Sequence, residues 1–196
     1  MTNKTNLILA ITGASGVIYG IRLLERLQHI TSIRTHLILS PPAFTTIEQE
    51  TDLQAEDVIA LADEHHAYEN IGAPIASGSF PSAGMIVSPC SIKSLSSIAS
   101  SHADNLITRA ADVQLKEGRP LLLMVRETPL HIGHLRLMLA AAEIGAVIMP
   151  PIPAMYTRPS SLDELIDHTV TRTLQRFGLD LPDAYQWEGT VHQNSK

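Results

Sequence analysis

Four segments of the sequence carry small or charged polar residues directly after short apolar runs. Glycine lets a ligand approach the backbone closely, and a helix that begins after such a turn offers free amide groups to an anion. Hydroxyl, ammonium and guanidinium groups donate hydrogen bonds that are strong when the acceptor is a phosphate. The residues that predict a phosphate-bearing ligand are Thr12-Gly13-Ala14-Ser15-Gly16, Ser40, Pro89-Cys90-Ser91-Ile92-Lys93-Ser94 and Arg126-Glu127-Thr128-Pro129.

Each of these segments also fits a purely structural role when taken alone. The glycine turn can be an ordinary strand-to-helix connection, Ser91 can simply cap a helix, and Arg126 beside Glu127 can form a surface ion pair. In open α/β sheets, however, ligands bind beyond the carboxyl ends of the strands, where these loops would meet. Their combination therefore favours the phosphate site.

Several common phosphate chemistries lack the residues that they need. A nicotinamide site requires an acidic residue about 20 positions after the glycines, and residues 28–47 contain none. The Gly-Lys-Ser/Thr phosphate loop of nucleotide hydrolysis is also missing from the sequence. We interpret His131 and His134 as capping or supporting residues, because no third ligand stands at a telling spacing, and we expect no metal site. His65-His66 is weaker evidence still, and Cys90 is expected to be buried and unreactive.

Alternating patterns predict the elements that position these loops. Apolar runs typical of strands buried on both faces cover residues 7–12, 35–39, 85–89, 120–125 and 146–149. Helical segments are predicted at residues 17–27, 46–62, 91–100, 109–117, 133–144 and 161–177. Ser161 and Glu164 are expected to form a capping box for the last helix. Right-handed crossovers then predict an α/β fold in which helices cover both faces of a doubly wound parallel sheet.

Composition limits the classes of function. The chain has 196 residues, 44% of them hydrophobic, and a formal net charge of −6. This length predicts a single domain at residues 1–188 with a polar tail at 189–196. The negative charge argues against a nucleic-acid or anionic-membrane binder, which needs excess Lys and Arg. No run reaches the about 20 apolar residues that span a bilayer. The single cysteine cannot form a disulfide within the chain, which fits a reducing compartment. A cytoplasmic protein is expected.

In order and spacing, seven segments resemble the UbiX/Pad1 flavin prenyltransferases, over nearly the whole chain, about residues 6–187. They are Thr12-Gly13-Ala14-Ser15-Gly16, Glu50-Thr51-Asp52, Ala76-Ser77-Gly78-Ser79-Phe80, Pro89-Cys90-Ser91-Ile92-Lys93-Ser94, Asp104-Asn105-Leu106-Ile107-Thr108-Arg109-Ala110-Ala111-Asp112, Arg126-Glu127-Thr128-Pro129-Leu130-His131 and Pro150-Pro151-Ile152-Pro153-Ala154-Met155-Tyr156.

The resemblance implies a flavodoxin-like, Rossmann-like fold that binds reduced FMN. Members of the family attach a dimethylallyl group from dimethylallyl monophosphate to N5 and C6 of reduced FMN. The prenylated flavin then serves partner decarboxylases of the UbiD type. The family forms large homo-oligomers with active sites at subunit junctions, so a homo-oligomer, for example a dodecamer, is expected here.

Position by position, the resemblance implies two groups of binding residues. Dimethylallyl monophosphate is expected to bind through its phosphate to Tyr156 and Arg172, assisted by Lys116 and Arg109. Ring closure at C6 requires a group that moves protons, for which Glu127 is the first choice, with Glu50 and Ser15 as helpers. The residues expected to contact FMN are Gly13, Ala14, Ser15, Ser40, Ser91, Ile92, Lys93, Ser94 and Arg126.

Three departures from the family pattern affect these expectations. Pro41-Pro42 replaces Lys-Ala after Ser40, Gly118 replaces an arginine, and Met155 replaces a phenylalanine beside Tyr156. The sequence has no Asp-rich diphosphate motif, which fits a metal-independent reaction. Three alternatives remain open: an FMN-dependent cysteine decarboxylase, an FMN-dependent aromatic-acid decarboxylase, and a non-catalytic flavin carrier subunit.

Overall fold

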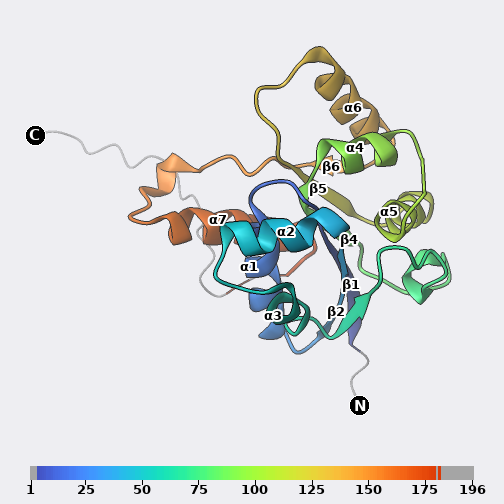
Figure 1. Ribbon diagram of the computed structural model, residues 1–196, viewed down its shortest axis with the longest axis horizontal. Coiled ribbons are helices and arrows are strands. Elements are labelled where there is room, and N and C mark those ends of the chain that lie inside the picture. Colours follow the sequence, from blue (N-terminus) through green and yellow to red (C-terminus); the bar gives the residue numbers. More distant parts are fainter. Residues whose placement is uncertain (1–3, 180, 182–196) are drawn as a thin grey trace, which may run out of the picture.

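The computed structural model of the chain describes residues 4–179 and 181, which form alternating strands and helices (Figure 1). The strands are β1 (Thr5–Ile11), β2 (Ile33–Leu39), β3 (Glu64–His66), β4 (Met85–Cys90), β5 (Leu121–Val125) and β6 (Val147–Ile148). The helices are α1 (Val17–Gln28), α2 (Pro41–Glu50), α3 (Ala55–Ile59), α4 (Ile92–Ala99), α5 (Leu106–Lys116), α6 (Ile132–Glu143) and α7 (Leu162–Gln175), with the short 3-10 helices η1 (Pro74–Ala76) and η2 (Met155–Thr157). The expected polar tail at 189–196 lies outside the described residues.

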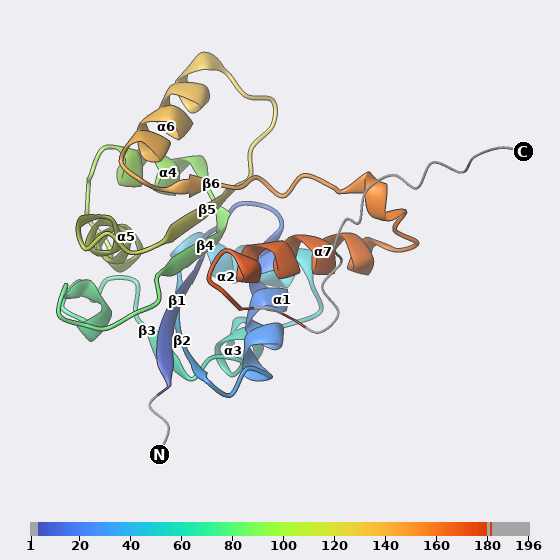
Figure 2. The same ribbon diagram turned by 180° about the vertical axis from the view of Figure 1, so that it is seen from behind.

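The strands form one parallel sheet in the order β3-β2-β1-β4-β5-β6. One face packs against α1, α2, α3 and α7, and the other face packs against α4, α5 and α6 (Figure 1 and Figure 2). The predicted doubly wound, flavodoxin-like α/β fold is therefore confirmed. Within the described residues, no helix combines the length and apolar character needed to cross a membrane.

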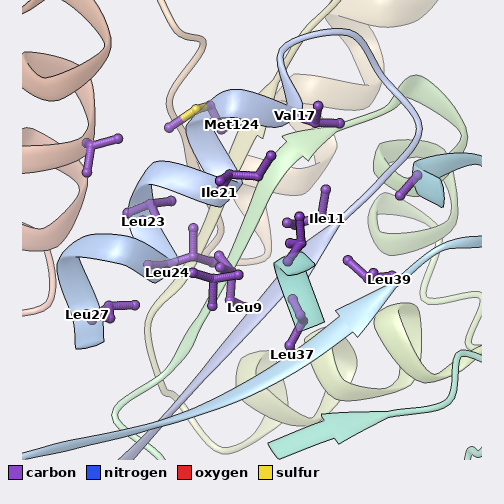
Figure 3. Packing of buried hydrophobic residues seen from close by; sticks show 14 of the residues in the cluster. Leu9, Ile11, Val17, Ile21, Leu23, Leu24, Leu27, Leu37, Leu39 and Met124 are labelled. Atoms are coloured by element: carbon purple, nitrogen blue, oxygen red, sulfur yellow. The ribbon is translucent and has the colours of Figure 1, made fainter. Parts of the chain in front are cut away.

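The core explains why β1 has a continuous apolar run. Side chains alternate between the two faces of a strand, so Leu9 and Ile11 join the cluster under α1, whereas Ile8 and Ala10 join the cluster under α4 and α5. Figure 3 shows Leu9 and Ile11 beside Ile21 and Leu24 of α1. A strand buried on both faces must be apolar at every position, and β1 meets that requirement from Leu7 to Ile11.

The order of the strands places a crevice between β1 and β4. The chain passes from β1 to β2 on one side, and β4 then lies on the other side of β1. Such a reversal separates the loops that follow the two strands, and ligands of open α/β sheets bind in the resulting crevice. The loops after β1 and β4 are two of those predicted to bind the phosphate.

The region between β2 and β4 differs from its prediction. One helix was expected over residues 46–62, but α2 ends at Glu50 and α3 begins at Ala55. The hydroxyl of Thr51 ends α2, because it donates to the carbonyl of Ile47 (2.8 Å) and accepts from the amide of Leu53 (3.1 Å). The structure also contains β3, which was not predicted, because its sequence Glu64-His65-His66 lacks the apolar pattern of a strand.

The start of α7 also differs in detail. Ser161 caps the helix as expected and accepts from the amide of Glu164 (3.2 Å). The reciprocal bond of a capping box is absent, because the carboxylate of Glu164 accepts from the amide and hydroxyl of Ser160 instead (2.6 and 2.7 Å). On the expected apolar stripe, Ile166 and Val170 are buried, but Leu162 is exposed.

Candidate functional site

The hydroxyl of Thr12 joins the loops that follow β1 and β4. It donates to the carbonyl of Pro89 (2.7 Å) and accepts from the amide of Ser91 (2.9 Å). The amide of Thr12 also donates to the carbonyl of Pro89 (3.3 Å). One side chain thus uses both its donor and its acceptor capacity to fix the two sides of the crevice relative to each other.

Ser40, at the end of β2, presents a polar group without a partner. Its side chain is buried, with 6% of its surface exposed, and its hydroxyl has no hydrogen bond to any other described residue. A buried hydroxyl without a partner costs free energy and calls for an explanation, such as a ligand that is bound in function. The structure therefore supports Ser40 as a ligand-binding residue.

The N-terminus of α4 presents hydroxyl and amide groups at the same crevice. Ser91 caps the helix: its Oγ accepts from the amide of Ser94 (3.3 Å) and donates to the Ser94 hydroxyl (3.2 Å). The amides of Ile92 and Lys93 lie in the first turn, where a helix offers no internal acceptor. The positive end of the helix dipole stabilises an anion there.

The N-terminus of α1 is occupied by Glu50. One oxygen of its carboxylate accepts from the amides of Gly16 (2.7 Å) and Val17 (3.2 Å). The expectation that the glycine turn offers free amides to an anion is therefore wrong for these two groups, because a side chain 34 residues away already binds them. This contact places the Glu50 carboxylate at the residue that directly follows Ser15, the other predicted helper, which is exposed.

Arg126 and Glu127 follow β5 and are both exposed. The amide of Arg126 donates to the carbonyl of Cys90 (3.1 Å), which places the loop beside the end of β4. Oε1 of Glu127 accepts from the amide of Thr128 (2.9 Å). The two side chains form no ion pair with each other in the described part of the chain, so the alternative of a surface pair is not supported.

Tyr156 and Arg172 belong to a second cluster, on α7 and η2. The hydroxyl of Tyr156 lies 3.2 Å from Nε2 of His168, and the two rings meet edge to face. His168 and Arg172 line a cavity of about 270 Å³, and Nη1 of Arg172 donates to Gln175 (2.7 Å). Burial, and secondly the charge of Arg172, lower the pKa of His168, so the ring is neutral near neutral pH. Sequence reasoning missed His168, although its spacing of four residues from Arg172 was a signal.

Arg109 and Lys116 lie away from this cluster within the chain. Both are on α5, which packs on the opposite face of the sheet from α7 (Figure 2). Arg109 pairs with Asp112 (3.0 Å), and Lys116 pairs with Glu117 (2.7 Å). A single copy of the chain therefore does not bring the four predicted phosphate ligands together.

Two further expectations are confirmed. Cys90 is fully buried, and burial raises the pKa of its thiol to about 12, so it is not a nucleophile near neutral pH. His131 caps α6, since its Nδ1 accepts from the amide of Gly133 (2.9 Å).

Comparison with known proteins gives consistent results. Residues 1–171 match the protein-family model described as Flavoprotein. The chain is 57% identical over 185 residues to a protein of Escherichia coli K12 named flavin prenyltransferase UbiX, covering 93% of this chain and 98% of that protein.

Two solved structures are similar along nearly their whole length. A crystal structure of AnUbiX (PadA1) in complex with FMN and dimethylallyl pyrophosphate is 46% identical, with a TM-score of 0.94, and the match covers 96% of this chain and 100% of that chain. A dodecameric FMN-dependent UbiX-like decarboxylase from Escherichia coli O157:H7 is 48% identical, with a TM-score of 0.92, and the match covers 94% and 100%.

Proposed function

This chain belongs to the UbiX family of flavin prenyltransferases, and from that premise we propose that it joins a dimethylallyl group from dimethylallyl monophosphate to N5 and C6 of reduced FMN. The observation that carries the proposal is the near-full-length match to UbiX proteins, one of them solved with FMN and dimethylallyl pyrophosphate. The enzyme is thus a transferase that acts on a flavin.

The residues of the crevice fit FMN. Ser40 supplies a buried hydroxyl that lacks a partner, and the first turn of α4 supplies amides and the hydroxyls of Ser91 and Ser94 at the positive end of a helix. A β-carbon at Gly13 would overlap Pro42, so the turn after β1 packs against the start of α2 only with glycine at position 13. We assign these residues, with Ala14, Ser15, Ile92, Lys93 and Arg126, to FMN binding.

The proposed reaction breaks the bond between the allylic carbon and the phosphate oxygen and joins that carbon to N5 of the flavin, which gives up its proton. Ring closure then consumes the double bond of the dimethylallyl group: its tertiary carbon bonds to C6, and the neighbouring carbon takes up a proton. Reduced FMN supplies the two nucleophilic positions, N5 and C6. Arg172 and Tyr156 donate charge-assisted and neutral hydrogen bonds to the leaving phosphate, which keeps its negative charge. Glu127 accepts the proton that C6 loses on ring closure. Ser15 and Glu50 hold the adjoining loop.

The positions of Arg109 and Lys116 support a site shared between copies of the chain. These two residues cannot reach the Tyr156 cluster around the sheet of their own chain, whereas a neighbouring copy could supply them. The exposed face of α6 carries Ile132, Leu135 and Leu139, which are 63%, 48% and 59% exposed, and this helix stands out from the rest of the molecule (Figure 1). Burial of such side chains favours association. We propose a homo-oligomer, with the dodecameric relative as the reference.

The product would be released to a decarboxylase of the UbiD type, and the reaction would take place in the cytoplasm. The first assignment rests on the family, whose prenylated flavin serves decarboxylases of this type, and the second rests on the single cysteine, which fits a reducing compartment. They complete the proposed role of this protein as a supplier of a modified flavin.

A product analysis tests the proposed function. The pure protein is incubated without oxygen with reduced FMN and either dimethylallyl monophosphate or dimethylallyl pyrophosphate, and the released flavin is analysed by mass spectrometry. A mass gain of one prenyl unit is expected with the monophosphate. Unchanged flavin in both reactions would overturn the proposal. Release of carbon dioxide from an aromatic acid or a peptide cysteine, with unmodified FMN, would instead establish a decarboxylase, the activity named for one relative.

A further inference from the structure

Two histidines and a glutamate meet on neighbouring strands at one edge of the sheet. In the parallel pairing of β2 with β3, His36 is opposite Glu64 and Ile38 is opposite His66. Because side chains alternate along a strand, His36, Glu64 and His66 share one face, and His65 points to the other. β3 is the edge strand beside β2 (Figure 2).

The side chains of these three residues converge. Nδ1 of His36 lies 3.0 Å from Nε2 of His66. The two oxygens of Glu64 lie 3.6 Å from these nitrogens, Oε2 from His36 and Oε1 from His66. Both imidazoles are buried, with 3% and 7% of their surface exposed, whereas the Glu64 side chain is 39% exposed.

Asn6 determines the tautomer of His36, that is, which of its two ring nitrogens carries the hydrogen. Nδ2 of Asn6 donates to the carbonyl of Pro81 (2.8 Å), so the amide oxygen of Asn6 is the atom that faces Nε2 of His36 (3.1 Å). Nε2 of His36 must then carry the hydrogen, and Nδ1 presents a lone pair toward His66 and Glu64. A metal-binding histidine is usually oriented in this way, by donating its other N–H to an oxygen.

We propose that His36 Nδ1, His66 Nε2 and the Glu64 carboxylate bind a divalent transition-metal ion, with Zn²⁺ as the favoured ion. Imidazole and carboxylate groups are ligands of Zn²⁺, and ions bound at about 2.0–2.2 Å hold tetrahedral ligand atoms about 3.3 Å apart. The observed separations of 3.0 and 3.6 Å bracket that value. When the ion binds, the hydrogen of His66 resides on Nδ1, and both rings stay neutral.

The surroundings leave room for a fourth ligand. A cavity of about 740 Å³ is lined by Asn6, His36 and Glu64, among other residues. Water or a small molecule from this cavity can complete the coordination of the ion. The cavity also contacts Lys4 and Arg34, near the starts of β1 and β2, whereas Ser40 and the phosphate-binding loops follow the ends of the strands. The site is therefore independent of the proposed transferase reaction.

Arg34 is the main opposing charge. Its Nη2 lies 3.4 Å from Oε2 of Glu64. Lys4, the other cation near the cavity, is paired with Asp63 (3.1 Å). Because both cations are half-exposed, solvent screens their repulsion of a bound ion, and Arg34 can remain beside the outer oxygen of the carboxylate.

A competition titration tests the site. The full chain, stripped of metal with a chelator and then desalted, is titrated with Zn²⁺ against a chromophoric indicator. One equivalent is expected to bind to the native chain. Glu64→Gln and His66→Gln should each weaken that binding at least about 10-fold. The matched control is His65→Gln, which removes the neighbouring histidine on the other face and should leave the affinity unchanged. Co²⁺ in place of Zn²⁺ should give the visible absorption of a tetrahedral ion in the native chain and lose it in Glu64→Gln.

Two outcomes would overturn the proposal. The first is the absence of a bound equivalent in the native chain, which would make His36 and His66 a hydrogen-bonded pair only. The second is equal binding by the native chain and Glu64→Gln, which would place the ion on other histidines. Circular dichroism and FMN content establish that each variant is folded. Should His66→Gln fail to fold, Glu64→Gln decides alone, because its side chain is partly exposed and the change conserves its shape.

Discussion

Gly13 lies directly against Pro42, so that a β-carbon at position 13 would overlap the Pro42 side chain and come within 3.0 Å of the Pro42 carbonyl carbon. The loop after β1 thus fits the first turn of α2 only with glycine. The atoms of Pro42 that crowd position 13 are its Cβ, Cα and carbonyl carbon, which an alanine at position 42 would also have, so the contact does not depend on this departure from the family pattern.

Gly13→Ala should weaken FMN binding, because the loop or the start of α2, which Ser40 directly precedes, must shift. Overpacking of this kind costs about 1–3 kcal/mol of stability. Gly72→Ala is the matched control, since the nearest atom to a β-carbon there is 3.6 Å away. Fluorescence titration of FMN and thermal unfolding of both variants provide the measurements. Equal FMN affinity in Gly13→Ala and the wild type would contradict the prediction.

Glu50→Ala should destabilise the protein, because it removes the acceptor for two amides at the start of α1. Loss of an N-terminal cap costs about 1 kcal/mol, measured as the change in the free energy of unfolding in urea. Glu48→Ala removes an exposed carboxylate two residues earlier on α2 and serves as the control. If both variants unfold at the same urea concentration, the contact of Glu50 with Gly16 contributes nothing to stability.

Glu127→Gln should retain FMN but lose turnover. The change conserves the shape of the side chain and an oxygen that can accept from Thr128, but it removes a group that can accept a proton. A decrease in kcat of about 100-fold or more is expected, with FMN affinity within a few-fold of wild type. Rates of prenylated-flavin formation are compared with those of Glu143→Gln, an exposed glutamate at the end of α6. Wild-type rates would rule out the proton-transfer role.

Arg172→Ala should raise the concentration of dimethylallyl monophosphate that the enzyme requires, without affecting FMN. A lost charge-assisted hydrogen bond costs about 1.5–3 kcal/mol, which is about 10- to 150-fold in affinity. Arg176→Ala is the control, because Arg176 is exposed one turn further on, at the C-cap of α7. Parallel titrations with dimethylallyl monophosphate and with FMN measure the affinity of each variant for the two ligands. A variant that lost FMN but bound the prenyl phosphate normally would show that the two phosphate sites are exchanged.

Cys90 should make the stability of the protein decrease in alkaline solution. Burial raises the pKa of its thiol to about 12, whereas the thiol of an unfolded chain ionises near pH 8.5. The unfolded state therefore loses a proton that the folded state keeps, and the contribution of this group is complete below about pH 8.5 and declines above it. Between pH 8.5 and 9.5 the free energy of unfolding should fall by about 1 kcal/mol more in the wild type than in Cys90→Ala. Urea unfolding at both pH values measures the difference, and identical slopes would contradict it.

Patterns that are local in sequence predicted most of the fold correctly. The apolar runs of β1, β2, β4 and β5 stood out because parallel strands are buried on both faces. β3 escaped prediction because its three residues are polar and its pairing with β2 depends on contacts across about 30 residues of chain. For the same reason His36 and His66 were not recognised as neighbours.

The candidate site was predictable as a set of loops but not as a set of contacts. Ser91 and Ser94 interact within one helical turn, so the capping position of Ser91 could be predicted from the sequence alone. Glu50 reaches Gly16 only because α2 packs beside α1, and no periodicity encodes that approach. The separation of Arg109 from Arg172 likewise depends on which face of the sheet each crossover helix covers.

The double hydrogen bond of Thr12 has a consequence for the catalytic cycle. Because this hydroxyl bonds the loops after β1 and β4 to each other, the chain itself fixes the floor of the crevice. Binding then requires little loss of backbone entropy. The product of the transferase is larger than the flavin that it accepts. When this product leaves, the two bonded loops keep their positions, so the binding site does not have to refold before the next turnover.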